Sequence, residues 1–226
     1  MLDSFLRRAI STAWLVAAAI AVLCGAAASA QQPGTPGKFD YWVESLSWSP
    51  GWCARHGGET ASRLQCRGNT TYGLIVHGLW PQYEDGTWPA TCRDSDRLPQ
   101  QVVDKLLPDT PSDDLVRHEW STHGTCTGLA PDEWVATVDK TFHKLRVPDE
   151  LADPKTPPAP TAAELKAMLV KANPGLSPDG VALICGRDRQ QIEEIRVCLN
   201  RDFGFRPCGA KVVDSCRGKL ELQAAK

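Results

Sequence analysis

Two short segments of the sequence place histidines beside groups that could take part in proton transfer. The first runs from His77 to Pro81 (HGLWP), and the second runs from His118 to Gly124 (HEWSTHG). In the second segment Glu119 and His123 are four residues apart, which places their side chains on one face of a helix. A carboxylate beside an imidazole favours the charged ring and fixes its orientation. Such a histidine can deliver or accept a proton near neutral pH.

A zinc site is the alternative interpretation of the second segment. The zinc-protease motif needs two histidines four residues apart on one helix face, whereas His118 and His123 are five apart, about 500° of helical rotation. Their rings therefore diverge, so we expect no metal and no other cofactor. The histidines outside the two segments, His56 and His143, are interpreted as scaffold residues.

Composition limits the class of protein. The chain has 226 residues, of which 42% are hydrophobic, enough for one large domain with a buried core and too many for a disordered chain. The formal net charge of -2 excludes a strongly basic surface. A protein with this charge would bind a polyanion such as RNA through a few placed groups rather than a broad positive field.

The first thirty residues have the pattern of a secretory signal peptide. A basic pair precedes a short apolar run (residues 13–23), and the small residues 28–30 (ASA) follow. We expect cleavage after Ala30, which leaves one domain over residues 31–226 in the periplasm or outside the cell. Lipidation at Cys24 is the alternative, but leucine precedes this cysteine where a small residue is wanted. No later segment is long and apolar enough to span a membrane.

Cysteine usage agrees with export. Of the nine cysteines, Cys24 falls within the predicted signal peptide, and an even number remains. In an exported chain this predicts four disulfides, each stabilising the fold by about 2–4 kcal/mol. No two cysteines have the C-x-x-C spacing of most structural zinc sites. Spacing alone leaves the pairing open.

Strands at both ends of the chain, with helices between them, would position the histidine segments. Strands are predicted over residues 39–48, 72–79, 181–185 and 192–199. Helices are predicted over residues 98–107, from the N-cap Ser112 into the second histidine segment, over 131–145, and from the cap Thr161 to residue 172. This order predicts an α+β domain with a largely antiparallel central sheet and packed helices.

Together the two histidine segments resemble the signatures of the ribonuclease T2 family, the secreted acid ribonucleases. Those signatures look like H-G-L-W-P and H-E-W-x-K-H-G-T-C, and they match His77 to Pro81 and His118 to Cys126. The opening segment, residues 39–53, resembles that of bacterial members. Residues 173–176 (NPGL) and the C-terminal cysteine pattern extend the resemblance over nearly all of the mature chain.

The resemblance implies an endoribonuclease that cleaves single-stranded RNA without a metal and with low base specificity. His77 and His123 would be the proton-transfer pair: one deprotonates the ribose 2′-hydroxyl, and the other protonates the departing 5′-oxygen. The product would be a 2′,3′-cyclic phosphate, later hydrolysed to a 3′-phosphate. Glu119 would support the pentavalent transition state and His118 would bind the phosphate. Because DNA lacks the 2′-hydroxyl, we expect no cleavage of DNA. We also expect a monomer without a membrane partner.

The resemblance also assigns base-binding residues and the disulfides. Trp80, Gln82 and Trp88 match the family positions that hold a base, with Trp88 where a tyrosine is familiar. Stacking on aromatic rings would bind every base. In contrast, Trp120 in the middle of a predicted helix is expected in the core. The implied disulfides are Cys92–Cys126, Cys53–Cys66, Cys185–Cys216 and Cys198–Cys208.

One residue departs from the family pattern. Thr122 stands where the family usually has a lysine, which would place positive charge on the phosphorane. Arg117 is the candidate to compensate. The departure leaves a second function open, a catalytically weak or inactive RNA-binding or inhibitory protein on the same scaffold, which would form no cyclic phosphate. A metal-dependent hydrolase is the third alternative, and it would lose activity on chelation.

Overall fold

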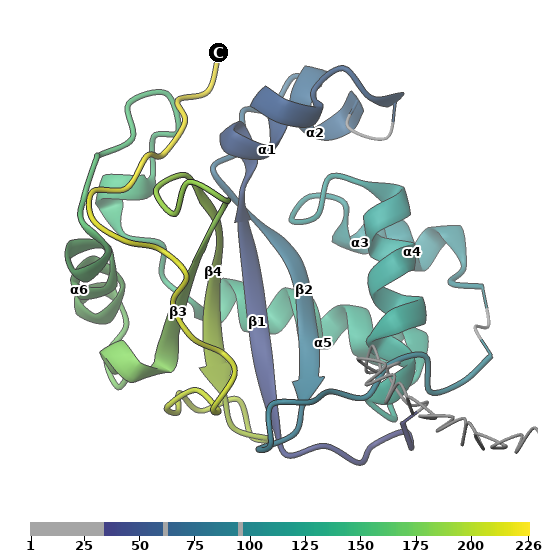
Figure 1. Ribbon diagram of the computed structural model, residues 1–226. Helices are drawn as coiled ribbons and strands as arrows, with labels where there is room; N and C mark the ends of the chain where they lie inside the picture. Colours follow the sequence, from purple (N-terminus) through teal and green to yellow (C-terminus); the bar gives the residue numbers. More distant parts are fainter. Residues whose placement is uncertain (1–33, 61–62, 95–96) are drawn as a thin grey trace, which may run out of the picture. The chain divides into compact units, whose positions relative to one another are not determined.

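The computed structural model describes residues 34–60, 63–94 and 97–226. The predicted signal peptide and its cleavage site lie outside these residues. A four-stranded sheet has the order β2-β1-β4-β3 (Figure 1), with every neighbouring pair antiparallel. Its strands are β1 (Tyr41–Trp48), β2 (Leu74–Gln82), β3 (Val181–Cys185) and β4 (Ile192–Leu199). The predicted α+β class is confirmed.

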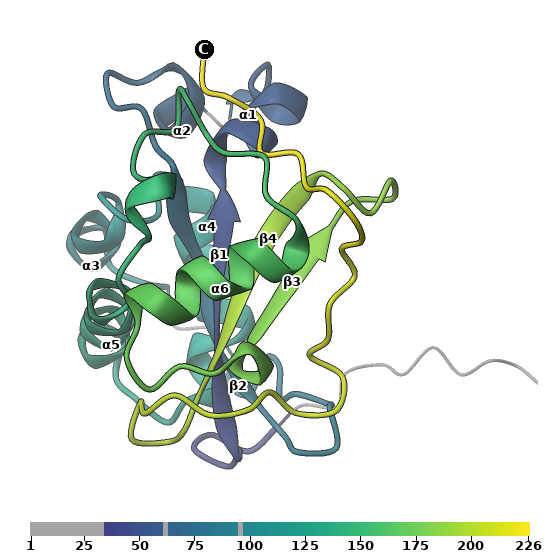
Figure 2. The same ribbon diagram turned by 90° about the vertical axis from the view of Figure 1, so that its left-hand side faces the viewer.

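Helices connect and flank the strands. In the described residues they are α1 (Ser49–His56), α2 (Arg63–Arg67), α3 (Gln100–Leu106), α4 (Asp113–Thr122), α5 (Pro131–Lys144) and α6 (Ala162–Ala172), with short 3-10 turns between some of them. Helix α5 lies behind the sheet in Figure 1, and the turned view places α3 on the same side (Figure 2). No helix in this part of the chain has the length and apolar character that crossing a membrane requires.

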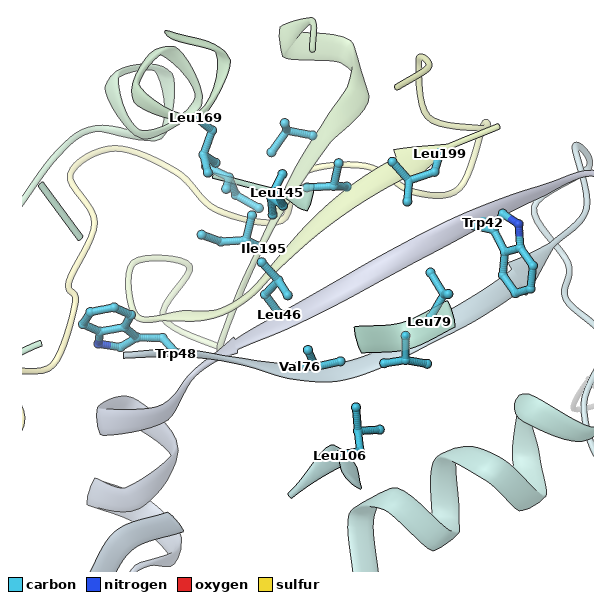
Figure 3. Packing of buried hydrophobic residues seen from close by; sticks show 14 of the residues in the cluster. Trp42, Leu46, Trp48, Val76, Leu79, Leu106, Leu145, Leu169, Ile195 and Leu199 are labelled. Carbon is cyan, nitrogen blue, oxygen red and sulfur yellow. The ribbon is translucent and has the colours of Figure 1, made fainter. Parts of the chain in front are cut away.

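The main core fills the space between one face of the sheet and the helices. Because side chains alternate along a strand, the even-numbered residues 42–48 of β1 face this core and the odd-numbered residues 41–47 face the other side. Figure 3 shows Leu46 and Val76 of the sheet lying between Leu106 of α3 and the α6 residue Leu169. The opposite face carries only a small apolar cluster. Polar groups can therefore occupy much of that face.

The predicted elements are present, with bounds that differ by a few residues. All four predicted strands form, and helices α3 to α6 form at the positions of the four predicted helices. Ser112 caps α4 by accepting a hydrogen bond from the backbone of Leu115 (3.3 Å). Helices α1 and α2 were not predicted. Pro50 follows the predicted strand 39–48 and lies in the first turn of α1, where its missing N–H costs nothing.

The eight described cysteines pair as the resemblance implies. The bonds are Cys53–Cys66, Cys92–Cys126, Cys185–Cys216 and Cys198–Cys208. The first joins α1 to α2, and the last two attach the C-terminal segment to β3 and β4. The second ties the loop after β2 to the turn after α4, and therefore links the two histidine segments.

One carboxyl group lies inside the main core. Glu44 of β1 is 1% exposed, and one of its carboxyl oxygens has no hydrogen-bond partner in the described residues. Burial raises its pKa to about 8, although Thr141 and Lys144 of α5 oppose the shift. The folded protein therefore holds a proton on Glu44 at neutral pH, where the unfolded chain releases it.

We expect Glu44→Gln to remove a pH-dependent loss of stability. Between pH 4.5 and about 8 the folded state of the wild type binds one more proton than the unfolded state at this position. Its free energy of unfolding therefore falls with rising pH, by about 1.4 kcal/mol per pH unit from this group alone. Glutamine does not titrate. Thermal unfolding should show equal melting temperatures near pH 4.5 and a more stable variant at pH 7.5.

The control for this measurement is Glu150→Gln, which changes an exposed carboxylate. It should follow the wild type at every pH. Parallel stability curves for the wild type and the Glu44→Gln variant would contradict the buried, protonated state of Glu44.

Candidate active site

His77 lies at a β-bulge within β2. Ser45 of β1 pairs with Gly78, and Leu46 pairs with Val76, so His77 is the extra residue of the bulged strand. Bulges re-aim side chains and are common beside active sites. The His77 ring lies on the face of the sheet opposite the main core. Its Nδ1 is 2.8 Å from a carboxylate oxygen of Glu194.

Helix α4 brings Glu119 against this bulge. Val116 and Trp120 of α4 are buried in the main core, as predicted for Trp120, and this fixes the side from which Glu119 projects. Glu119 is 3% exposed, and its Oε1 lies 3.6 Å from Nε2 of His77. Its Oε2 accepts a hydrogen bond from the indole N–H of Trp80 (2.6 Å). A single buried carboxyl group therefore contacts two residues of the first segment.

His123 is the C-cap residue of α4, and its ring lies beside the same tryptophan. The Trp80 ring is 5.4 Å from the ring of His123 and 5.2 Å from that of His77, centroid to centroid. The two histidines that are far apart in the chain therefore meet at one indole. His118, one turn earlier on α4, is exposed, and its charge acts on His123.

The pKa values of the two histidines are displaced in opposite directions. Burial disfavours the charged form of His77, but the hydrogen bond to Glu194 and the charge of Glu119 outweigh burial, so the pKa of His77 is raised. His123 has no such partner: burial, and then the charges of His118 and His77, lower its pKa to about 3. Its Nδ1 is buried without a hydrogen-bond partner in the described residues. His77 therefore keeps its proton to higher pH than His123 does.

The pKa of Glu119 is also displaced from its ordinary value. Burial raises its pKa to about 7, although the charge of His77 and the hydrogen bond from Trp80 oppose the shift. The carboxyl group is therefore protonated in mildly acidic solution. In that state it can donate a hydrogen bond to an anion, as well as accept one.

A cavity of about 330 Å³ opens beside His77, between α1 and the start of α4. Its walls include Trp52, Arg55 and His56 of α1, Ser112 and Leu115 near the start of α4, and Ser47, Ile75, Glu193 and Glu194 of the sheet. No motif marks these residues, because they come from separate segments. His56, predicted to be a scaffold residue, stacks on Trp52 and bonds to Glu59, and it forms part of this wall.

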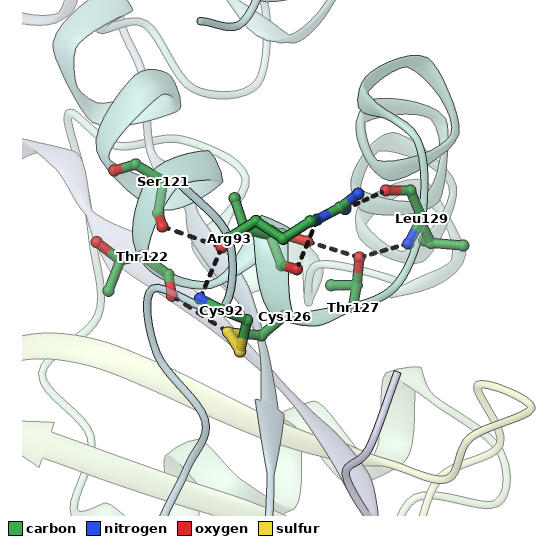
Figure 4. Close-up of a disulfide and its surroundings, with 9 residues drawn as sticks. Cys92, Arg93, Ser121, Thr122, Cys126, Thr127 and Leu129 are labelled. Carbon is green, nitrogen blue, oxygen red and sulfur yellow. Dashed lines mark hydrogen bonds between the residues drawn. A yellow bond between two sulfur atoms is a disulfide. The ribbon is translucent and has the colours of Figure 1, made fainter. Parts of the chain in front are cut away.

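The predicted base-binding residues differ in accessibility. Trp80 is half-buried between the two histidine rings, Gln82 is 6% exposed, and Trp88 is 40% exposed. The loop that carries Trp88 is attached to the end of α4 by the Cys92–Cys126 disulfide (Figure 4). Trp88 is the most exposed of the three.

Arg117, the candidate to compensate for the absence of lysine at position 122, is held by three hydrogen bonds. Its guanidinium donates to Asp113, to the backbone carbonyl of Leu98 and to Gln100, each at 2.6 Å. These bonds use three of the five N–H donors of the guanidinium and hold α4 to the segment that begins α3. Compensation by Arg117 stays a prediction. Thr122 itself is the last residue of α4 and is partly exposed.

The candidate site does not coincide with the one group of side chains in the described residues that could share a metal ion. That group is Asp109, which follows α3, with Asp139 and His143 of α5. His143 bonds to Asp109 (3.1 Å) and lies 3.4 Å from Asp139, as expected of a scaffold histidine.

The fold and site define an α+β protein with two histidines and a buried carboxyl group on one polar sheet face. Residues 39–208 match the model of the Ribonuclease T2 family. A ribonuclease of Aeromonas hydrophila is 32% identical over 182 residues, which cover 76% of this chain and 77% of that protein. A probable ribonuclease of Haemophilus influenzae is 33% identical over 122 residues, which cover 49% of this chain and 45% of that protein. The chain therefore belongs to the ribonuclease T2 family.

Solved structures agree with this fold. An RNase-related protein from Calystegia sepium superposes with a TM-score of 0.66 at 20% identity, covering 84% of this chain and 99% of that one. RNase NT in complex with 5′-AMP superposes with a TM-score of 0.64 at 21% identity, covering 83% and 99%. At these identities the likeness concerns the fold alone.

Proposed function

We propose that this protein cleaves single-stranded RNA by metal-independent transesterification, with His123 as general base and His77 as general acid. Its family makes it a ribonuclease of the T2 type, and the chemistry is inferred from the site. One observation carries the assignment: two imidazoles whose pKa values are displaced in opposite directions lie against the same indole ring. Groups separated in this way are typical acid and base partners.

His123 is suited to remove the proton of the ribose 2′-hydroxyl. A base must be neutral at the working pH, and burial keeps this ring neutral down to about pH 3. The freed 2′-oxygen attacks the adjacent phosphorus. Because this nucleophile is tethered to its target, the enzyme supplies orientation rather than an activated water.

His77 is suited to protonate the departing 5′-oxygen. The hydrogen bond to Glu194 favours the charged ring, and Nε2 of His77 lies 3.6 Å from a carboxyl oxygen of Glu119. Proton donation breaks the P–O5′ bond and leaves a 2′,3′-cyclic phosphate. In the second stage the roles reverse, and water opens the ring to a 3′-phosphate.

Glu119 and His118 would stabilise the phosphorane. Below about pH 7 a protonated Glu119 donates a hydrogen bond to a phosphoryl oxygen instead of repelling it. The exposed ring of His118 adds a hydrogen-bond donor from the preceding turn of α4. The contribution of Glu119 is strongest in acid.

The cavity beside His77 would hold the nucleoside that leaves. His77 delivers its proton to the 5′-oxygen, so the leaving nucleoside must lie on the His77 side of the phosphorus, where the cavity opens. The base on the other side of the phosphate would stack on Trp88, with Trp80 and Gln82 completing its pocket. Stacking accepts every base, which agrees with low specificity.

We infer export from the signal-peptide pattern and the disulfides. Four disulfides are typical of oxidising compartments, and residues 1–30 have a signal-peptide pattern. Sequencing the N-terminus of the mature protein tests whether cleavage follows Ala30.

The direct test is product analysis on a dinucleotide in the presence of a chelator. We expect a 2′,3′-cyclic phosphate followed by a 3′-phosphate, and no reaction with the 2′-deoxy analogue. Binding without any product would favour the inactive RNA-binding protein. Loss of activity on chelation would favour the metal-dependent hydrolase.

Installing the lysine that the family usually has should increase the rate. Thr122→Lys adds a cation at the C-terminal end of α4, adjacent to His123, where it can stabilise the phosphorane. We expect kcat to rise about 10-fold, measured on a dinucleotide at pH 5.

Ser121→Lys is the control, because it adds the same charge about 100° around the helix. It should leave kcat within about 2-fold of the wild type. Equal gains in both variants would show that net charge, rather than position 122, sets the rate.

A further inference from the structure

We propose that Glu194 is the positioning residue of His77: a partly buried carboxylate, anchored by Arg196, that fixes the orientation of the imidazole and favours its charged form. The proposal rests on the proposed function, in which His77 is the general acid. Nothing in the two histidine segments points to Glu194, which lies on β4 and is separated from His77 by 117 positions.

The hydrogen bonds of Glu194 define its role. Its Oε1 lies 2.8 Å from Nδ1 of His77, and its Oε2 accepts from the hydroxyl of Ser45 (3.1 Å) and from Nε of Arg196 (2.8 Å). Both carboxylate oxygens are therefore occupied. With Nδ1 bound to Glu194, the ring must present Nε2 to the open side of the site, where Glu119 lies 3.6 Å away.

The strand geometry explains how these groups meet. Glu194 and Arg196 are two residues apart on β4, so they share the face opposite the main core. Ser45 of β1 is directly opposite Arg196 and belongs to the same face. The bulge at His77 on β2 then turns the imidazole across β1 toward Glu194. The contact is therefore made by side chains of three adjacent strands, and no loop residue takes part in it.

Several charged or titratable groups act on His77. Glu194 and Arg196 reach it from β4, and Glu119 reaches it from α4. His123 follows α4, and Arg55, His56 and Glu193 line the cavity beside the ring. Among them only Glu194 hydrogen-bonds to the ring.

Glu194 remains ionised through the working range. Burial raises the pKa of a carboxyl group, but the hydrogen bond and charge of His77, and then Arg196, outweigh burial and hold the pKa of Glu194 at about 2. A fixed anion at Nδ1 favours the imidazolium form. Arg196 has two effects, since it anchors Glu194 (Nη2 to Oε2, 2.7 Å) and its own charge opposes the charge of His77.

Arg196 also joins this contact to the rest of the site. Its guanidinium lies over the Trp80 ring, 5.1 Å from the centroid. The indole N–H of Trp80 holds Glu119, and the ring borders both histidines. The carboxylate–imidazole pair is thus packed into the same unit as the groups that would touch the phosphate.

The test compares two substitutions with opposite expected effects. Glu194→Gln keeps the shape and a hydrogen-bonding group but removes the charge, so the pKa of His77 should fall by about 1–2 units. Arg196→Met keeps the stem over Trp80 and removes the opposing cation, so that pKa should rise. NMR titration of the ring-labelled histidines measures both shifts directly, with His77→Ala assigning the resonance.

Kinetics give the second measurement. The alkaline limb of the kcat/KM profile should move to lower pH in Glu194→Gln, with activity within about 3-fold of the wild type at pH 5 and lower by about 10-fold or more at pH 7.5. Asp139→Asn is the matched control, because it removes the carboxylate near a histidine outside the site. It should change neither the His77 titration nor the profile.

The outcomes separate a positioning role from a structural one. A lost hydrogen bond that only loosened the fold would lower activity equally at all pH values and would shift the His77 titration in the same direction in both variants; either result overturns the proposal. If the wild type cleaves no RNA, the proposed function fails, and the NMR titration still decides whether Glu194 holds the charge of His77. Thermal unfolding confirms that each variant is folded.

Discussion

Alanine at His77 or at His123 should each lower kcat for an ordinary dinucleotide by about 10²–10⁴-fold, the usual contribution of a general acid or base. The two losses should differ, however, when the leaving group changes. A nitrophenolate leaves without a proton, so a 3′-nitrophenyl phosphate ester of a nucleoside does not need the general acid. The His77→Ala variant should recover most of its activity on that ester. The His123→Ala variant should not, because the 2′-hydroxyl still has to lose its proton.

The measurement is the ratio of kcat/KM for the nitrophenyl ester to that for the dinucleotide, in wild type and both variants at pH 5. His143→Ala is the control, since that exposed histidine bonds to Asp109 outside the site. Recovery in His123→Ala instead of His77→Ala would reverse the assignment of acid and base. Full activity of either variant on the dinucleotide would remove that histidine from the chemistry.

Much of this site could be predicted from the sequence because its two segments are local. Glu119 and His123 share a helix face by their spacing, and the helix forms because Ser112 caps it and its apolar residues face the core. The α+β class followed in the same way from the order of strands and helices. In each case the determining interactions lie within about one element of the chain.

The unpredicted parts depend on pairings between distant strands. Glu194 becomes a partner of His77 only because β4 and β2 flank β1 and a bulge turns the imidazole. Neither the strand order nor the bulge can be read from local periodicity. Arg117 shows the same limit: its position near the second segment in sequence indicated a role at the phosphate, whereas its hydrogen bonds to Leu98 and Gln100 hold the guanidinium at the start of α3.

The glycine of the first segment is required by the same close packing. A Cβ atom at Gly78 would overlap the carboxyl group of Glu119 and the indole nitrogen of Trp80, which are hydrogen-bonded to each other above it. Neither group can withdraw easily, because Glu119 is buried and the Trp80 ring is held between two histidines. The site therefore needs a residue without a side chain here.

We expect Gly78→Ala to lower kcat/KM by about 10²-fold or more, because displacing catalytic groups by about 1 Å costs this much. Gly58→Ala is the control, since a Cβ at Gly58 meets no atom within 4 Å, and its activity should equal that of the wild type. Combining Gly78→Ala with Glu119→Ala relieves part of the overlap. If the glycine acts through Glu119, this double variant should be little worse than Glu119→Ala alone. Additive losses would show that Gly78 serves the backbone bulge instead, and an unimpaired Gly78→Ala enzyme would contradict the close packing of Glu119 on β2.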